Sequence, residues 1–138
     1  MADMTLRIYI IDEHPQVRKN LVRRLSASEG IAVIGESGDA PVALEEITAL
    51  EPDVVLLEVK MKRADGVDVC SQISGINDRI KVVVLTSYID ADEFRRTRQA
   101  GAVAYLLKGL DVAGLARELR MLVARSVDGS VGLVCKAG

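Results

Sequence analysis

Aromatic residues and cysteines are scarce in this sequence of 138 residues. It has no tryptophan, one phenylalanine and three tyrosines, so its interior has to be built mainly from valine, leucine and isoleucine. The two cysteines, Cys70 and Cys135, are far apart and form no Cys-x-x-Cys motif. Together with the lack of a signal-like apolar segment at the start, they predict a protein of the reducing cytoplasm.

Several features that indicate particular functions are also missing from the sequence. No apolar run approaches the ~20 residues of a membrane-spanning helix. The net charge of −2 gives no overall positive field toward nucleic acid or anionic membranes. His14 is the only histidine, which argues against a Ser-His-Asp triad or a multi-histidine metal site. No glycine-rich phosphate-binding loop is present. We therefore expect neither membrane contact nor direct nucleic acid binding.

Hydrophobic residues make up 49% of the chain, and they occur in short runs that alternate with amphipathic segments. Length and composition predict a single soluble domain with an aliphatic core. The expected strands are residues 6–11, 31–35, 54–57, 82–85 and 102–107. Because strands and helical segments alternate five times, the pattern predicts a doubly wound α/β fold, in which helices cover both faces of a parallel sheet.

The expected strand at 54–57 organises the rest of the chain. Its run of two valines and two leucines is typical of a strand that is buried on both faces. This strand stops at Glu58. The other expected strands also stop at polar residues, namely Asp12 with Glu13, Thr86, and Lys108. Since the carboxyl ends of parallel strands meet at one edge of a sheet, the sequence predicts a site there.

Three carboxylates, a hydroxyl and an ammonium group at one edge predict a particular chemistry. Two unit charges about 5 Å apart repel by roughly 3 kcal/mol at an effective dielectric constant near 20. Lys108 can neutralise one carboxylate, and Mg²⁺ can be held by one or two carboxylates, a carbonyl and waters. Such a combination suits a phosphoryl group. Taken singly, each residue is more simply explained as a solvated strand end.

Four motifs carry a resemblance to a known family: IIDEHP, PDVVLLEVKM followed by DG, VVVLTS and AYLLKG. In their order and spacing they resemble the receiver domains of two-component response regulators, over residues 6 to about 125. The opening DEHPQVRKNL is most similar to regulators with a LuxR-type helix-turn-helix output domain. The resemblance implies a flavodoxin-like (βα)5 sheet with strand order 2-1-3-4-5. It places a receiver domain at 1–125 and a tail or interdomain linker at 126–138.

The resemblance also assigns roles to individual residues. Glu58 stands where the family has its phosphoacceptor aspartate. The metal ligands that it implies are Asp12, Glu13, Glu58 and the backbone carbonyl of Lys60. It further implies that Thr86 is the switch hydroxyl that follows the phosphoryl group, that Lys108 pairs with this group, and that Tyr105 is the aromatic switch whose ring moves inward on activation.

Two residues depart from the family's pattern. Lys62 replaces the proline that usually follows the methionine. At the phosphoacceptor position Glu58 is one methylene longer than aspartate, roughly 1.5 Å of extra reach, and small misplacements of a nucleophile are costly in phosphoryl transfer. We expect this carboxylate to contact Thr86 and Lys108 without phosphorylation and to imitate the activated state. We also expect Mg²⁺ to bind weakly or not at all. The alternative is that Glu58 only preserves a charge in a vestigial pocket.

The expected function is therefore that of an atypical, non-enzymatic receiver domain in a phosphorelay. The partners implied are a histidine kinase or another signalling protein, and a second copy bound through the fourth helix, fifth strand and fifth helix. Those helices carry Arg95, Arg96, Arg98, Arg117, Arg120 and Arg125, beside Asp92, Glu93 and Glu118; a plain solvated face explains these charges more simply. The alternatives in other classes are a Mg²⁺-dependent phosphatase or phosphotransferase on the same fold, and a scaffold module.

Overall fold

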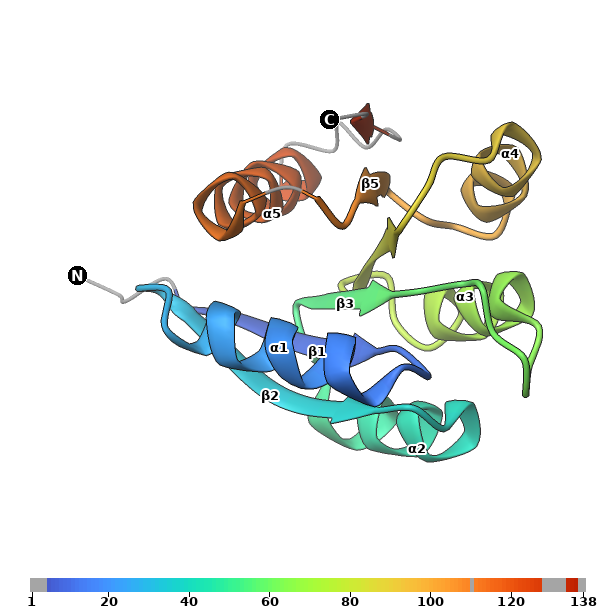
Figure 1. Cartoon of the computed structure of the whole chain (residues 1–138), viewed down its shortest axis with the longest axis horizontal. Coiled ribbons are helices and arrows are strands. Elements are labelled where there is room, and N and C mark those ends of the chain that lie inside the picture. The colour runs from blue at the N-terminus through green and yellow to red at the C-terminus, as the bar shows by residue number, and fades with distance from the viewer. Residues whose placement is uncertain (1–4, 110, 128–133, 137–138) are drawn as a thin grey trace.

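The computed structural model describes residues 5–109, 111–127 and 134–136, and in this part of the chain it contains one six-stranded sheet (Figure 1). The strands are β1 (Leu6–Ile11), β2 (Ile31–Ser37), β3 (Val54–Leu57), β4 (Lys81–Thr86), β5 (Ala104–Leu107) and β6 (Val134–Lys136). They are ordered β2-β1-β3-β4-β5-β6, and every neighbouring pair is parallel. The predicted order 2-1-3-4-5 is confirmed.

Helices cover both faces of the sheet (Figure 1). They are α1 (Pro15–Ser26), α2 (Ala40–Leu50), α3 (Gly66–Ser74), α4 (Ala91–Gln99) and α5 (Val112–Val127). One half of the aliphatic core joins α1 and α5 to the sheet through residues such as Leu25 and Leu119. The other half joins α2 and α3 through residues such as Ile47 and Ile73, and Phe94 of α4 packs against it. The central strand β3 is buried over its whole length, as its apolar run predicted.

Side-chain caps explain where several helices begin. The carboxylates of Asp39, Asp65 and Asp90 accept hydrogen bonds from backbone N–H groups in the first turns of α2, α3 and α4, which satisfies donors that a helix start leaves unpaired. His14 caps α1 and accepts from Val17 N at 3.3 Å. The single histidine therefore lies at a helix start, next in sequence to Asp12 and Glu13.

The C-terminal segment differs from the sequence-based expectation. The expected boundary between the receiver domain and the tail lies after residue 125, but α5 continues to Val127, so this boundary falls inside the helix. The segment 134–136, which includes Cys135, adds β6 in parallel to β5. We did not predict β6, because three residues flanked by glycine-containing sequence have no readable period. None of the helices in the described ranges is both long and apolar enough to cross a membrane.

Candidate functional site

Four neighbouring strands bring polar side chains to one edge of the sheet. Asp12, Glu58 and Lys108 directly follow β1, β3 and β5, and Thr86 is the last residue of β4. Three of these side chains belong to residues that are almost completely buried, with exposed fractions of 3% for Asp12, 7% for Glu58 and 0% for Thr86. Because a solvated strand end would be exposed, burial favours a built polar site over that simpler explanation.

Lys108 pairs with two buried carboxylates at once. Its Nζ lies 2.7 Å from Asp12 Oδ2 and 3.0 Å from Glu58 Oε1. Burial by itself lowers the pKa of Lys108, but the hydrogen bond to Asp12 and the charge of Glu58 outweigh it and raise the pKa above its usual value. The second oxygens are also bound, since Asp12 Oδ1 accepts from His14 N at 2.9 Å and Glu58 Oε2 accepts from Lys60 N at 3.0 Å.

Glu13 points to a different part of the edge. Its two carboxylate oxygens accept hydrogen bonds from the backbone N–H groups of Lys62 and Arg63, both at 2.8 Å. These bonds lower the pKa of Glu13. Within the described ranges, no three acidic, histidine or cysteine side chains gather closely enough to hold a metal ion. The structure thus brings Asp12 and Glu58 together through Lys108, whereas both oxygens of Glu13 are bound to backbone N–H groups.

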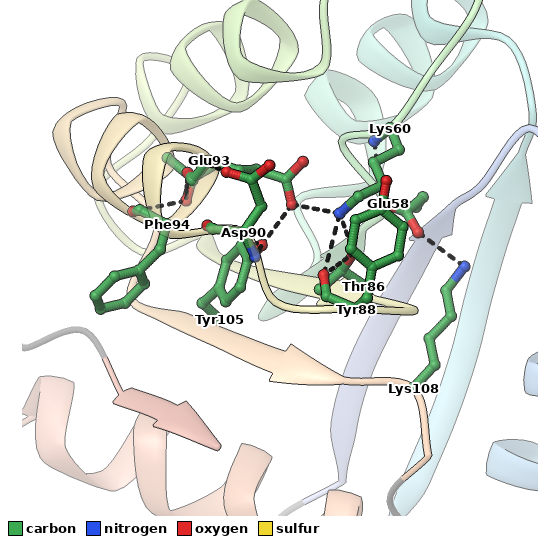
Figure 2. Close-up of polar contacts among 10 residues, drawn as sticks. Glu58, Lys60, Thr86, Tyr88, Asp90, Glu93, Phe94, Tyr105 and Lys108 are labelled. Carbon is green, nitrogen blue, oxygen red and sulfur yellow. Dashed lines mark hydrogen bonds and ion pairs between the residues drawn. The ribbon is translucent and has the colours of Figure 1, made fainter. Parts of the chain in front are cut away.

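The side chain of Lys60 occupies the place that we expected Glu58 to take beside Thr86. Lys60 Nζ lies 2.5 Å from Thr86 Oγ1 and 2.7 Å from Glu93 Oε1 (Figure 2). Of the two expected contacts of Glu58, the one with Lys108 is therefore present, whereas the hydroxyl of Thr86 has the ammonium of Lys60 as its neighbour. The family resemblance implies a role only for the backbone carbonyl of Lys60, as a metal ligand, and the charge of its side chain counted only against an enzymatic function. Its position two residues after Glu58 was the available signal.

Tyr105, which the resemblance implies to be an aromatic switch, points into the protein interior. Its side chain is completely buried, and its ring packs edge-on against Phe94 at 5.5 Å between ring centroids (Figure 2). The hydroxyl donates to Glu93 Oε1 at 2.5 Å. Burial, followed by the hydrogen bond to Glu93, raises the pKa of Tyr105 well above its ordinary value.

A pocket of about 410 Å³ opens over this edge of the sheet. Its walls include acidic and basic side chains from the ends of β1, β3 and β5 together with the exposed ring of Tyr88. The charged lining residues are Asp12, Glu13, Glu58, Lys60, Lys62 and Lys108. Most of the sequence-predicted site residues therefore line one concave site, whereas Thr86 and Tyr105 are not part of its lining.

Comparison with known proteins shows which family the chain belongs to. The model of the response regulator receiver domain matches residues 8–120. The chain belongs to this receiver domain family. The transcriptional regulatory protein LiaR of Bacillus subtilis is 37% identical to this receiver domain over 115 residues, which cover 83% of the chain and 54% of LiaR. PdtaR of Mycobacterium tuberculosis is 37% identical over 125 residues, which cover 90% of the chain and 60% of PdtaR.

Solved structures agree with this assignment. A LuxR-family two-component response regulator from Aurantimonas sp. SI85-9A1 superposes on the receiver domain with a TM-score of 0.79 at 26% identity, covering 87% of this chain and 86% of that one. The signal receiver domain of NarL from Mycobacterium tuberculosis gives 0.73 at 30% identity, with 91% and 96% covered. The receiver domain spans only 54% to 60% of the length of LiaR and PdtaR.

Proposed function

We propose that this receiver domain of a two-component response regulator signals without ordinary aspartyl phosphorylation. The observation that carries the proposal is that the carboxylate of Glu58, the residue at the phosphoacceptor position, is already bound by other groups of the protein. Both of its oxygens have partners, Lys108 Nζ at 3.0 Å and Lys60 N at 3.0 Å. A carboxylate held in this way, and one methylene longer than aspartate, is poorly placed for in-line attack on a phosphoryl donor.

The same contacts support an active-like resting state. Glu58 already pairs with Lys108, the lysine that the family resemblance pairs with a phosphoryl group. Tyr105 is already buried, which is the position that the resemblance associates with activation. We therefore propose that Glu58 stands in for the phosphorylated aspartate.

The phosphodonor experiment tests the first part of this proposal. Purified protein is incubated with acetyl phosphate and Mg²⁺ beside the variant Glu58→Asp, and intact masses are measured. We expect no gain of mass in the natural protein and a gain of one phosphoryl group in the variant, because aspartate restores the shorter nucleophile. A stoichiometric gain on Glu58 of the natural protein would overturn the proposal.

Receiver domains generally bind Mg²⁺ at their phosphorylation site, but the donor groups of this chain do not fit that ion well. Asp12 is paired with Lys108, Glu13 is bound by two backbone N–H groups, and Glu58 is bound to Lys108 and Lys60 N. We propose that Mg²⁺ binds weakly or not at all. Titration calorimetry with MgCl₂ tests this, and tight binding to the natural protein would contradict it.

The partners that we propose follow from the family. Receiver domains interact with histidine kinases, and LiaR and PdtaR are named transcriptional regulatory proteins. We propose that this domain controls an output module and pairs with a second copy through the α4–β5–α5 surface. Asp92 forms ion pairs with Arg95 and Arg96 within α4, and a solvated face is still the simpler explanation of these charges. Sedimentation equilibrium of the natural protein and of Arg95→Glu tests the pairing; a monomer in both cases would refute it.

The rival enzymatic function is disfavoured by Lys60. A phosphatase of this kind needs a second acid–base carboxylate two residues after its nucleophile, and here that position holds an ammonium group that is paired with Glu93. An assay of phosphate release from a generic phosphomonoester should therefore show no turnover.

A further inference from the structure

The side chain of Lys60 joins segments that are far apart in the sequence (Figure 2). Its Nζ donates to Thr86 Oγ1 at 2.5 Å, to Glu93 Oε1 at 2.7 Å and to the backbone carbonyl of Tyr88 at 3.2 Å. An ammonium group has three protons, so each proton has an acceptor. The ring of Tyr88 also lies 4.2 Å from Nζ, measured to the ring centroid. We call this arrangement the Lys60 bridge.

A single oxygen of Glu93 extends the Lys60 bridge to β5. Glu93 Oε1 accepts both from Lys60 Nζ and from the hydroxyl of Tyr105 at 2.5 Å. The Tyr105 hydroxyl in turn accepts from Asp90 N at 3.2 Å, at the start of α4. The position of the buried Tyr105 ring is thereby tied to an ammonium group on the loop after β3.

Burial makes this connection effective. The side chains of Lys60 and Glu93 are only 24% and 15% exposed, so solvent screens their attraction incompletely, and hydrogen bonds between ionised groups are stronger than neutral ones. Without the ammonium group, the Glu93 carboxylate would lose its counter-charge while it is still largely buried. It would then turn toward water, and the Tyr105 hydroxyl would keep only its longer hydrogen bond to the backbone carbonyl of Asp90, at 3.5 Å.

Glu58 does not supply this connection. Its side chain pairs with Lys108 on the β1 side of the pocket, and it reaches the Lys60 bridge only through the backbone N–H of Lys60. The bridge lies on the β4 side, where its members come from β4, α4 and β5. The two halves of the site can therefore be tested separately.

We infer that Lys60 is a positioning residue that holds Tyr105 in its buried position without any phosphoryl group. The Lys60 bridge thereby acts as a conformational device. The ammonium group of Lys60 sets the conformation of the α4–β5 surface. This inference rests on the proposed function in that it names the group that maintains the phosphorylation-independent state. Lys60, rather than Glu58 alone, then determines whether Tyr105 is buried.

The test compares Lys60→Met, which keeps a long side chain but removes the charge, with Lys19→Met, which removes the same charge from an exposed position on α1. Solution NMR measures the hydrogen exchange rate of the Asp90 amide, which donates to Tyr105, against the amide of Ile10 in the central sheet. We expect about tenfold faster exchange at Asp90 in Lys60→Met, the factor for one lost hydrogen bond. Ile10 and the Lys19→Met protein should be unchanged.

Two further observations complete the experiment. The ring resonances of Tyr105 should shift toward solvent-exposed values in Lys60→Met, and in a Glu93→Ala background the same substitution should have no additional effect. If Lys60→Met fails to fold, Lys60→Gln takes its place. Unchanged exchange at Asp90 and unchanged Tyr105 resonances in a folded, neutral variant would overturn the inference. Because no phosphodonor is used, this result is independent of whether Glu58 accepts a phosphoryl group.

Discussion

At the scale of single residues, the site depends on the ammonium group of Lys108, which pairs with two buried carboxylates. Asp12 and Glu58 expose 3% and 7% of their surface, and both contact the same ammonium group. An ion pair of this kind adds little compared with an apolar core, but removing one partner leaves an uncompensated buried charge. The energetic importance of Lys108 is therefore set by the acids around it.

Replacing Lys108 with methionine should lower the free energy of unfolding by about 3 kcal/mol, since such losses are typically 3–5 kcal/mol for buried pairs. Adding Glu58→Gln should recover part of this loss, because only the carboxylate of Asp12 is then buried without a counter-charge. Urea unfolding measures both, with Lys19→Met as the surface control, which should stay within about 0.5 kcal/mol of the natural protein. A loss from Lys108→Met as small as that of the control would contradict this account.

At the scale of elements, α3 fixes the loop that carries Glu58 and Lys60. Gly66, the first residue of α3, packs directly on Val59: a Cβ added to Gly66 would lie 2.1 Å from the backbone oxygen of Val59 and 2.4 Å from its Cα. Backbone atoms cannot be displaced as easily as a flexible side chain. The start of α3 and the end of β3 therefore form one tightly packed unit below the pocket.

The variant Gly66→Ala should be destabilised by about 1–3 kcal/mol, the usual range for overpacking, and should loosen the contacts of Lys60. Gly75→Ala at the other end of α3 is the matched control. There an added Cβ meets its nearest neighbours at 3.5 and 3.6 Å, which is ordinary contact. Denaturant unfolding of both variants checks this expectation, and equal stabilities would show that the loop can move away from α3 at little cost.

At the scale of the whole molecule, the buried tyrosines make the fold sensitive to alkali. Tyr9 on β1 and Tyr105 on β5 are both completely buried. Burial and hydrogen bonds to Glu46 and Glu93 raise the pKa of each phenol above 10.0. Each phenol therefore keeps its proton more tightly in the folded state than in the unfolded state. This contribution to stability is complete below the unfolded pKa and is lost as the pH rises toward the folded one.

We expect the free energy of unfolding to fall steadily above about pH 10, the ordinary tyrosine value. Tyr105→Phe should show a shallower decline because one of the two shifted phenols is absent. Urea unfolding at several pH values from neutral to alkaline measures the slope. Identical slopes for the natural protein and the variant would mean that Tyr105 contributes nothing to this pH dependence.

The sequence alone determined the parallel architecture and the edge where the site lies. Short apolar runs ending at Asp12, Glu58 and Thr86 are local signals, and the strand order follows once four motifs identify the family. The caps Asp39 and Asp90 are likewise local features, since each carboxylate binds the first turn of its own helix. These features are readable because strand period, capping chemistry and motif spacing each depend on residues that are close together in the chain.

Only the tertiary structure decided how the charged side chains at that edge pair with one another. Nothing local shows that Lys60 reaches Thr86 and Glu93, or that Glu13 turns to the backbone of Lys62 and Arg63. The addition of β6 to β5 was equally unreadable. The physical reason is that long side chains have several rotamers of similar energy, and the choice among them depends on partners that the fold brings from distant parts of the chain.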